Sequence, residues 1–348
     1  MHGVQTSTPE AGPSTPLPTA GQPELGLRPR LLDQVRDSLR RRRYSLRTEK
    51  VYIHWIRRFI LFHGKRHPRE MGVDEIIAFL NHLARAGRVS ASTQNQALSA
   101  LLYLYRQVLT VRLPWLDGVE RAKTTRRIPS VLTVEQVQSV LARLEGSRWL
   151  MVSLMYGAGL RLMECLSLRV KDLGFERGQL VVRNGKGARD RMTMLPRALM
   201  EPLRAHLVKV KALHDADLQA GLGRVALPFA LEVKYPNAGL QWGWQFVFPS
   251  SGTCTSPYTG KTVRHHVHPK TLQRAVSQAA RSSGLAQPVT CHTFRHCFAT
   301  HLLESGTDIR TVQEVMGHKD VTTTMIYTHV MKKPGIGVLS PLDMRSPG

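Results

Sequence analysis

The chain has 348 residues, which is long enough for two domains with separate hydrophobic cores. Its formal net charge is +24, and because residues 1–26 hold two acidic and no basic side chains, the remainder carries +26. Such an excess favours a polyanionic partner, either nucleic acid or an anionic membrane surface. The longest apolar run, Trp149–Leu160, is too short to span a bilayer, and four cysteines do not make a disulfide framework. We therefore expect a soluble protein of the reducing cytoplasm, without a secretory signal or membrane association, that binds nucleic acid.

The first third of the chain predicts a tail followed by a small helical domain. Residues 1–29 are rich in Pro, Ser, Thr and Gly and are predicted to be disordered. Residues 30–112 show apolar side chains at helical spacing in four segments, and Ser45 is placed to cap the second helix. A basic run lies where the first two helices meet, and it is either a solvated face or a DNA contact. The run consists of Arg40, Arg41, Arg42 and Arg43.

A basic linker is predicted between the two domains. Residues 113–130 contain two prolines and several basic side chains without hydrophobic periodicity. Such a segment can lie along a phosphate backbone, so we expect DNA contacts from Lys123, Arg126 and Arg127.

A second domain is predicted over residues 131–332, followed by a tail over 333–348. Thr133 and Gln136 form a capping-box pattern, and Asn184–Gly187 marks a β-hairpin between apolar segments. Residues 219–250 are predicted to be irregular. Helices are expected at about 134–144, 147–157, from 161, 197–218, 269–283, 292–305, 308–316 and 321–330. The predicted fold is mainly α with a small β-sheet: an N-terminal helical domain and an α+β domain.

The second domain contains the groups that a side-chain hydroxyl needs to cleave a phosphodiester: a nucleophile, cations, an acid and a base. Arg161 follows a glycine turn that opens a helix, a favourable position for a phosphate, although a surface ion pair would look the same. Lys186 lies between two glycines at the hairpin tip, where it is either a general acid or an exposed turn lysine.

The remaining candidates lie between residues 292 and 327. His292 and Arg295 are one helical turn apart, which suits joint contact with a phosphate. His318 follows Gly317, a predicted helix-ending glycine, and either donates to a phosphate or complements the helix end. Tyr327 is either a nucleophile or a core aromatic, and its hydroxyl, with an ordinary pKa of about 10, needs nearby cations.

Metal binding is the rival interpretation of this segment. His292 and His296 are spaced i, i+4 and are flanked by other possible ligands, namely Cys291, Cys297 and His301. There is, however, no Cys-x-x-Cys pair and no glutamate of the His-Glu-x-x-His type. We therefore expect neither a metal nor a cofactor.

Taken together, the ordered set Arg, Lys, His-x-x-Arg, Gly-His, Tyr resembles the tyrosine recombinase family. The spacing agrees as well, because His292 lies 131 positions after Arg161 and Tyr327 lies 35 after His292. The resemblance implies a SAM-like core-binding domain followed by a catalytic domain, closing as a clamp on DNA. It also implies that Arg161 and Arg295 hold the scissile phosphate and that Tyr327 forms a 3′-phosphotyrosyl bond. In the same scheme Lys186 protonates the 5′-oxygen, His292 does acid–base work, and His318 hydrogen-bonds the phosphate.

An extra stretch, within about residues 222–245, resembles the insertion that marks integron integrases. That resemblance covers roughly residues 30–343 and implies a mobile-element enzyme that integrates and excises gene cassettes as a homotetramer. Its implied DNA partners are a duplex attachment site and a cassette site folded from one strand into a hairpin. Aromatic side chains beside basic ones are stacking platforms for unpaired bases. The candidates for that contact are Lys234, Tyr235, Trp242, Trp244 and His266; alternatively, the two tryptophans pack the insertion onto the domain.

Two other functions fit part of this pattern. A type IB topoisomerase uses a similar set of residues to relax supercoils, without the insertion or a tetramer. A catalytically inactive DNA-binding protein would bind duplex DNA with a steep salt dependence and form no covalent adduct.

Overall fold

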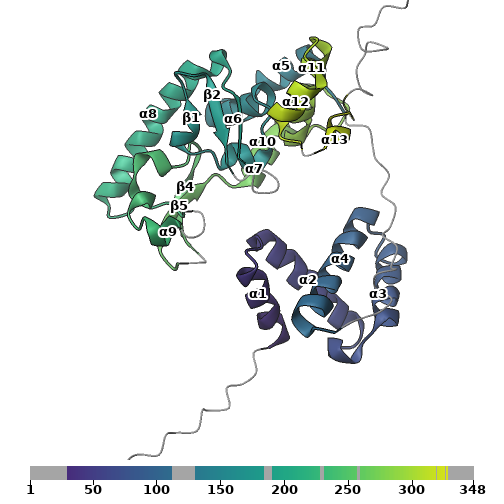
Figure 1. The fold of residues 1–348 in the computed structure, drawn as a ribbon. Coiled ribbons are helices and arrows are strands. Elements are labelled where there is room, and N and C mark those ends of the chain that lie inside the picture. Colours follow the sequence, from purple (N-terminus) through teal and green to yellow (C-terminus); the bar gives the residue numbers. More distant parts are fainter. Residues whose placement is uncertain are drawn as a thin grey trace, which may run out of the picture. The chain divides into compact units, whose positions relative to one another are not determined.

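A computed structural model describes residues 30–111, 130–183, 190–227, 231–256, 259–318, 320–325 and residue 327. The described residues fall into two compact units, an N-terminal unit over 30–111 and a C-terminal unit from residue 130 onward. Helices dominate both units, and the C-terminal unit adds two small sheets (Figure 1). The predicted class, mainly α with little β structure, is confirmed.

The N-terminal unit is the predicted set of four helices. They are α1 (Leu31–Arg41), α2 (Leu46–Phe62), α3 (Val73–Arg85) and α4 (Ala91–Tyr103), with a short 3-10 turn at Pro68–Glu70. The Ser45 side chain accepts the Thr48 amide hydrogen, so the predicted cap of α2 is present. The chain continues from α4 as a π-helix, η2 (Leu104–Leu109), which the sequence pattern does not distinguish from α-helix. The core includes Phe59 and Phe79, whose rings meet edge to face.

The C-terminal unit is built around α6 (Gly146–Gly157), which packs against both α8 and α11. Thr133 and Gln136 form the predicted capping box at the start of α5. The other helices are α5 (Val134–Leu141), α7 (Leu162–Leu166), α8 (Arg197–Gln219), α10 (Pro269–Ser282), α11 (Cys291–Glu304), α12 (Ile309–Met316) and α13 (Val321–Met325). Apolar side chains of α5, α6, α7, α8, α10 and α11 form one core that runs from Leu132 to Cys297, and those of α12 pack with the later part of α11 and Tyr327 in a second cluster.

The predicted hairpin between residues 180 and 194 is present as a pair of antiparallel strands. These are β2 (Gln179–Val182) and β3 (Arg191–Met194), and β1 (Leu173–Gly174) extends the sheet beside β2. The hairpin tip, including Lys186, lies outside the described residues.

The expectation that residues 219–250 are irregular is wrong in part. This stretch contains α9 (Leu231–Lys234), 3-10 turns at Ala238–Leu240 and Trp242–Trp244, and the start of β4 (Pro249–Thr255). β4 pairs with β5 (Thr262–His266), a hairpin that was not predicted. The reason is that most side chains of β4 are exposed, so the strand lacks the alternation of apolar and polar residues that marks a half-buried strand.

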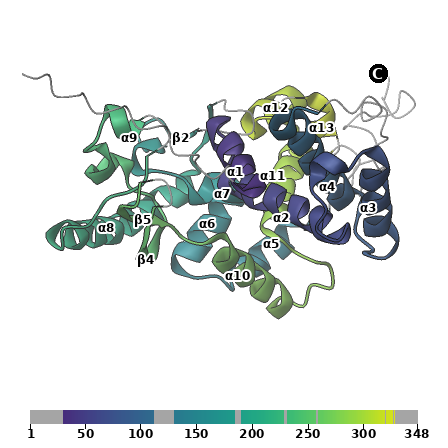
Figure 2. The ribbon, with the colours of Figure 1, turned by 90° about the horizontal axis from the view of Figure 1, so that it is seen from below.

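The two ends of the C-terminal unit carry different elements. Both views place α9, β4 and β5 at one end, while α11, α12 and α13 lie together at the other (Figures 1 and 2). We call the end that carries α9, β4 and β5 the insertion end, and α8 also reaches it. Within the part of the chain that the structure describes, no helix is both long and apolar enough to cross a membrane.

Candidate active site

A buried carboxylate at the start of α7 gathers three arginines. Glu164 accepts hydrogen bonds from both terminal nitrogens of Arg191, at 2.9 and 2.8 Å, and from Arg161 Nη1 at 2.6 Å. Arg295 Nη1 lies 3.7 Å from Glu164 Oε2. Burial alone would raise the pKa of Glu164, but the bonds and charges of Arg191 and Arg161 lower it to about 2. We call Arg161, Arg191 and Arg295 the arginine cluster, because three positive groups surround this single negative one.

The glycine turn before α7 places Arg161. Gly159 has a positive φ of 63°, and a Cβ on it would lie 2.5 Å from the Phe298 ring. Glycine is therefore needed both for the backbone conformation and for close packing onto α11. Arg161 follows as the N-cap residue of α7, with its amide bonded to Glu164 at 2.8 Å. Its side chain keeps 24% of its surface exposed, so it is the member of the cluster most accessible to a ligand.

Arg295 connects α11 with the end of α12. Its side chain is 1% exposed and donates to the Gly159 carbonyl, to the Met316 carbonyl at 2.5 Å and to His318 Nε2 at 3.2 Å. Burial, and then the charge of Arg161, lower the pKa of Arg295 to about 9, so it remains a cation at neutral pH. A fully buried guanidinium whose one carboxylate is shared with two other arginines favours the binding of a further anion.

His318 is held in a defined tautomer. Since an arginine can only donate, His318 Nε2 accepts from Arg295, and Nδ1 then carries the proton that is donated to Thr324 Oγ1 at 2.9 Å. Burial and the charge of Arg295 lower the pKa of His318 to about 3, so the ring is neutral at pH 7. Gly317 ends α12 in the left-handed region, as predicted, with φ 62°.

Tyr327 is buried beside His318 and His296 rather than on the surface. The residue is 3% exposed, and its ring stacks on that of His318 with centroids 6.1 Å apart. Its hydroxyl is 3.0 Å from His296 Nδ1. Burial raises the pKa of Tyr327, while Arg295 and Arg161 act to lower it. Burial, followed by the charges of His292 and Arg295, lowers the pKa of His296 to about 4, so its ring is neutral at pH 7.

The structure thus brings together four of the six predicted catalytic residues through direct contacts or shared partners: Arg161, Arg295, His318 and Tyr327. His292 lies beside them on α11, exposed, with its ring 4.6 Å from that of His296.

Three residues of the site were missed by sequence reasoning: Glu164, Arg191 and His296. An acidic residue three positions after Arg161 is a local signal that could have identified Glu164. The i, i+4 spacing of His292 and His296 indicated His296 only as a possible metal ligand. Arg191 gave no local signal, because its partners Glu164 and Val315 are remote in sequence.

The side chains that suggested a metal site have other partners. His301 contacts the Tyr156 hydroxyl at 2.9 Å and the Leu132 carbonyl at 3.0 Å. The Leu132 amide donates to Cys297 Sγ, and Cys291 belongs to the hydrophobic core. These contacts fix the segment before α5 against α11.

At the insertion end the aromatic candidates are packed against cations. Arg169 donates to the Trp244 carbonyl at 2.6 Å and to Ala226 at 2.9 Å, and its guanidinium lies over the rings of Trp244 and Phe246. Lys171 Nζ is 2.7 Å from the centre of the Trp244 ring. Trp244 is therefore half-buried with two cations over its ring, and these cation–π contacts join the insertion to the rest of the unit.

The other insertion candidates differ in exposure. Trp242 is half-buried and stacks on His214 of α8, with centroids 6.0 Å apart. His266 is half-buried against Phe246, and burial lowers its pKa to about 4. Tyr235 is 48% exposed, with Lys234 Nζ 5.3 Å from its ring centre, so it is the candidate aromatic of this end that faces solvent most.

The basic candidates outside the C-terminal unit are only partly described. Arg40 pairs with the buried Glu49 at 2.9 and 3.1 Å, whereas Arg41, Arg42 and Arg43 are exposed. The linker candidates Lys123, Arg126 and Arg127 lie outside the described residues.

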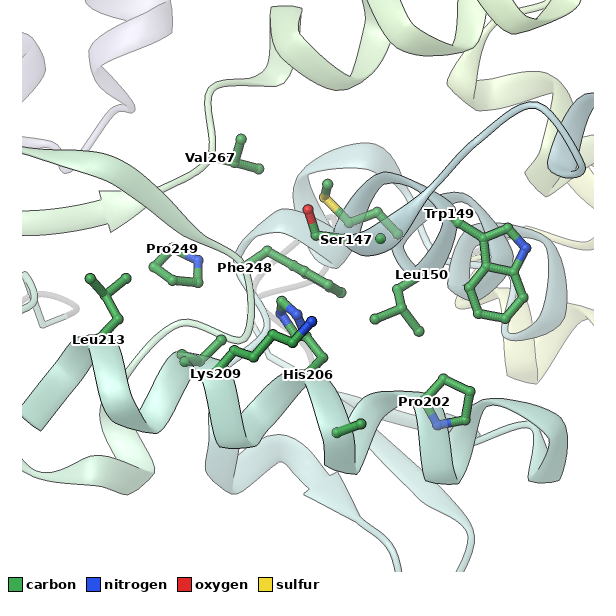
Figure 3. A pocket seen from close by; sticks show the side chains of 14 residues that line it. Ser147, Trp149, Leu150, Pro202, His206, Lys209, Leu213, Phe248, Pro249 and Val267 are labelled. Atoms are coloured by element: carbon green, nitrogen blue, oxygen red, sulfur yellow. The ribbon is translucent and has the colours of Figure 1, made fainter.

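A separate groove of about 500 Å³ lies between α6 and α8 (Figure 3). His206 and Lys209 of α8 face Trp149 and Leu150 of α6 across it. None of the five predicted catalytic residues that the structure describes lines this groove.

Comparison with known proteins agrees with this geometry. The phage integrase family pattern matches residues 130–333, and the pattern of its N-terminal SAM-like domain matches residues 31–115. The fold and site define a DNA strand-transferring enzyme of the tyrosine site-specific recombinase class. The chain belongs to the phage integrase family.

Individual relatives cover nearly the whole chain. An integrase/recombinase of Escherichia coli is 50% identical over 318 residues, covering 91% of this chain and 94% of that protein. The tyrosine recombinase XerD of Halalkalibacterium halodurans is 30% identical, covering 77% of this chain and 80% of its own length. The crystal structure of the XerH site-specific recombinase bound to a palindromic difH substrate superposes with a TM-score of 0.56. It is 20% identical over 86% of this chain and 82% of that one, which supports the same fold.

Proposed function

We propose that this recombinase is an integron integrase that cleaves and rejoins DNA through a 3′-phosphotyrosyl bond on Tyr327. The observation that supports it most is the surplus of positive charge near Tyr327: three guanidinium groups share one carboxylate, and the charges of two of them, Arg295 and Arg161, act on the tyrosine hydroxyl. A pentavalent phosphate in that space supplies the missing negative charge. Arg161 and Arg295 bind its oxygens, and His318 adds a further hydrogen bond after a change of tautomer that moves its proton to Nε2, the nitrogen that faces Arg295.

The proton of Tyr327 goes to a histidine. The neutral ring of His296 is already 3.0 Å from the hydroxyl, so it is positioned to accept that proton as the tyrosine oxygen attacks phosphorus. The P–O bond to the 5′-oxygen then breaks, and Lys186 protonates this leaving oxygen. His292, which lies next to His296 on α11, takes part with it in acid–base catalysis. The phosphodiester energy is kept in the phosphotyrosyl bond, so the exchange consumes no nucleotide.

The substrate is proposed from the insertion. A cassette site folded from one strand displays unpaired bases, and an exposed ring beside a cation is a platform for them. Tyr235 with Lys234 has that form. Trp244 packs in one apolar cluster with Leu231 at the start of the same short helix, α9, which ties the platform to the rest of the insertion. We propose duplex attachment sites and folded hairpins as DNA partners, a homotetramer as the synaptic assembly, and the cytoplasm as the place of action. The N-terminal unit, the linker over 113–130 and the C-terminal unit together close on the DNA.

The chemistry is tested with a nicked suicide substrate, which traps the covalent protein–DNA species. Wild-type protein is expected to accumulate the adduct, and Tyr327→Phe to lose it while binding the same DNA with unchanged affinity. The phenylalanine keeps the buried ring, so a loss of adduct reports the hydroxyl rather than the packing. An adduct of unchanged yield in Tyr327→Phe would refute the assignment.

The proton acceptor is tested by comparing two histidines one turn apart. His296→Ala is expected to lower single-turnover cleavage about a hundredfold, the ordinary contribution of a positioned base. If the base is His296, a rise in pH toward the tyrosine pKa restores cleavage in His296→Ala, because hydroxide then removes the proton. His292→Ala, lacking the contact with Tyr327, should not be restored. Restoration of the His292 variant alone would assign the base to His292 instead.

The substrate class is tested by recombination at a bottom-strand hairpin and at a duplex site. Tyr235→Ala is expected to reduce the hairpin reaction several-fold more than the duplex reaction, and Tyr235→Phe to behave as wild type. Equal losses at both sites would contradict hairpin recognition by Tyr235 and would indicate a recombinase that acts on duplex DNA. Relaxation of supercoils without exchange between partners would instead favour a type IB topoisomerase.

A further inference from the structure

A hollow of about 330 Å³ lies in the N-terminal unit beside the basic run. Its lining includes the rings of Tyr44, Tyr52 and Tyr103 and the guanidinium groups of Arg42 and Arg106. The volume is at the lower end of the range for pockets that hold small molecules, and it suits one nucleotide.

The three rings form a fixed wall with one accessible member. Tyr103 is 7% exposed, and its hydroxyl is 2.9 Å from Ser38 Oγ. The rings of Tyr44 and Tyr52 each lie 5.5 Å from that of Tyr103 in edge-to-face geometry. Tyr44 is 41% exposed, so it presents ring surface to solvent while its neighbours hold its orientation.

The backbone places the two arginines at the rim of the hollow. Arg43 has φ 57°, and the bonds from Arg43 N to Arg40 O and from Tyr44 N to Leu39 O close the α1 end as a Schellman turn. That left-handed position is usually glycine, and an L-residue there costs about 1 kcal/mol. The turn fixes Arg42 and Tyr44 on one side. Arg106 comes from the π-helix η2, a form that is frequent at functional sites.

Aromatic and cationic groups around one concave site suit a nucleotide outside the base stack. The base stacks on Tyr44, and the phosphate lies between Arg42 and Arg106. A paired base cannot enter such a hollow, because its faces are covered by its neighbours in the duplex. We propose that this hollow binds one unstacked nucleotide of the DNA on which the enzyme acts, an inference that rests on the proposed folded-strand substrate. It is a second nucleotide contact, separate from the insertion.

The probe is a DNA hairpin with one extrahelical 2-aminopurine, compared with the same hairpin lacking that nucleotide. Tyr44→Ala in the full chain is expected to weaken binding of the bulged hairpin about tenfold, a typical loss for one stacked base. Binding of the hairpin without the bulge should change less than twofold. Tyr44→Phe keeps the ring and should bind both as wild type. Stacking on Tyr44 also quenches 2-aminopurine fluorescence in the wild-type complex, and Tyr44→Ala should abolish that quenching.

Phe62→Ala is the matched control, because Phe62 is a similarly exposed ring (40%) of the same unit that does not line the hollow. It should leave both affinities unchanged. Equal weakening of both hairpins by Tyr44→Ala, or wild-type binding and quenching in that variant, would overturn the proposal. A different experiment tests the proposed function: if wild-type protein formed no covalent adduct on the suicide duplex, that function would be wrong, whatever the bulge contributes to binding.

Discussion

At the α11–α13 end of the C-terminal unit three guanidinium groups share one carboxylate, whereas at the insertion end the buried Arg264 has a carboxylate of its own. Arg264 is paired with Asp217 at 2.5 and 2.7 Å, and Arg169 donates to two carbonyls and lies against two rings. Three guanidinium groups on one carboxylate leave positive charge unbalanced, whereas the Arg264–Asp217 pair is neutral. An unbalanced buried charge is an anion site, whereas a balanced one holds elements together.

The largest effect is expected from removing the two buried carboxylates. Glu164→Gln leaves the arginine cluster without a counter-charge, and Asp217→Asn does the same to Arg264. Each is expected to lower the free energy of unfolding by about 3 kcal/mol, as when one partner of a buried pair is lost. Only Glu164→Gln should also reduce single-turnover cleavage, at least a hundredfold, because only that carboxylate orients groups around the phosphate. Urea unfolding and suicide-substrate trapping measure the two effects.

If Asp217→Asn reduced cleavage as strongly at a temperature where it is folded, the contrast between the two ends would be wrong.

Lowering the pH should reduce the free energy of unfolding in two steps, through Glu164 and the two buried histidines near Tyr327. The folded pKa of Glu164, about 2, is below its ordinary 4.5, so its contribution is complete above about pH 4.5 and disappears as the pH falls toward 2. The difference corresponds to about 3 kcal/mol. His318 and His296, with folded pKa values of about 3 and 4, are neutral in the fold but take up protons in the unfolded chain below about pH 6.5.

The free energy of unfolding should therefore begin to fall near pH 6.5 and fall further below pH 4.5. Urea unfolding between pH 8 and 3 measures this profile. Glu164→Gln should flatten the lower step and keep the upper one. A lower step that persists in Glu164→Gln would assign it to other carboxylates.

A medium effect is expected from the tryptophans of the insertion. Trp244→Ala removes a half-buried ring that contacts both Arg169 and Lys171, and should cost about 2 kcal/mol. Trp242→Ala removes the stacking on His214 and a solvated cation–π contact with Lys211, and should cost about 1 kcal/mol. Thermal unfolding of the two variants checks the order. The reverse order would show that the contacts of Arg169 and Lys171 with the Trp244 ring are not what anchors the insertion.

The sequence predicted the helices of both units well, because their signals are local. Ser45, the Thr133–Gln136 box and Gly317 mark helix ends through contacts within a few residues, and the structure contains each of them. The β4–β5 hairpin was missed since its strands have no buried alternating face and are defined by pairing.

The candidate site was predictable only where residue types occur in a recognisable order. Tyr327 on its own is a buried core aromatic, which was the competing interpretation, and its packing against His318 agrees with both readings. What sequence could not provide is the pairing of Glu164 with Arg191, 27 positions away, or the contact of His296 with the tyrosine hydroxyl. Those depend on how β3, α7 and α11 pack, and tertiary packing has no local periodicity.

The smallest effects on the free energy of unfolding are expected from two lysine substitutions, one that removes a close cation–π contact and one that removes a distant one. Lys171 Nζ lies 2.7 Å from the Trp244 ring centre, while Lys211 Nζ lies 5.9 Å from that of Trp242 and pairs with the exposed Asp215. An exposed ion pair and a solvated cation–π contact each contribute little, so Lys211→Ala should change the free energy of unfolding by less than about 0.5 kcal/mol. Lys171→Ala should cost about 1 kcal/mol. A loss at Lys211 equal to that at Lys171 would mean that proximity to the ring does not set the strength of these contacts, and the account of how the insertion end balances its charge would need revision.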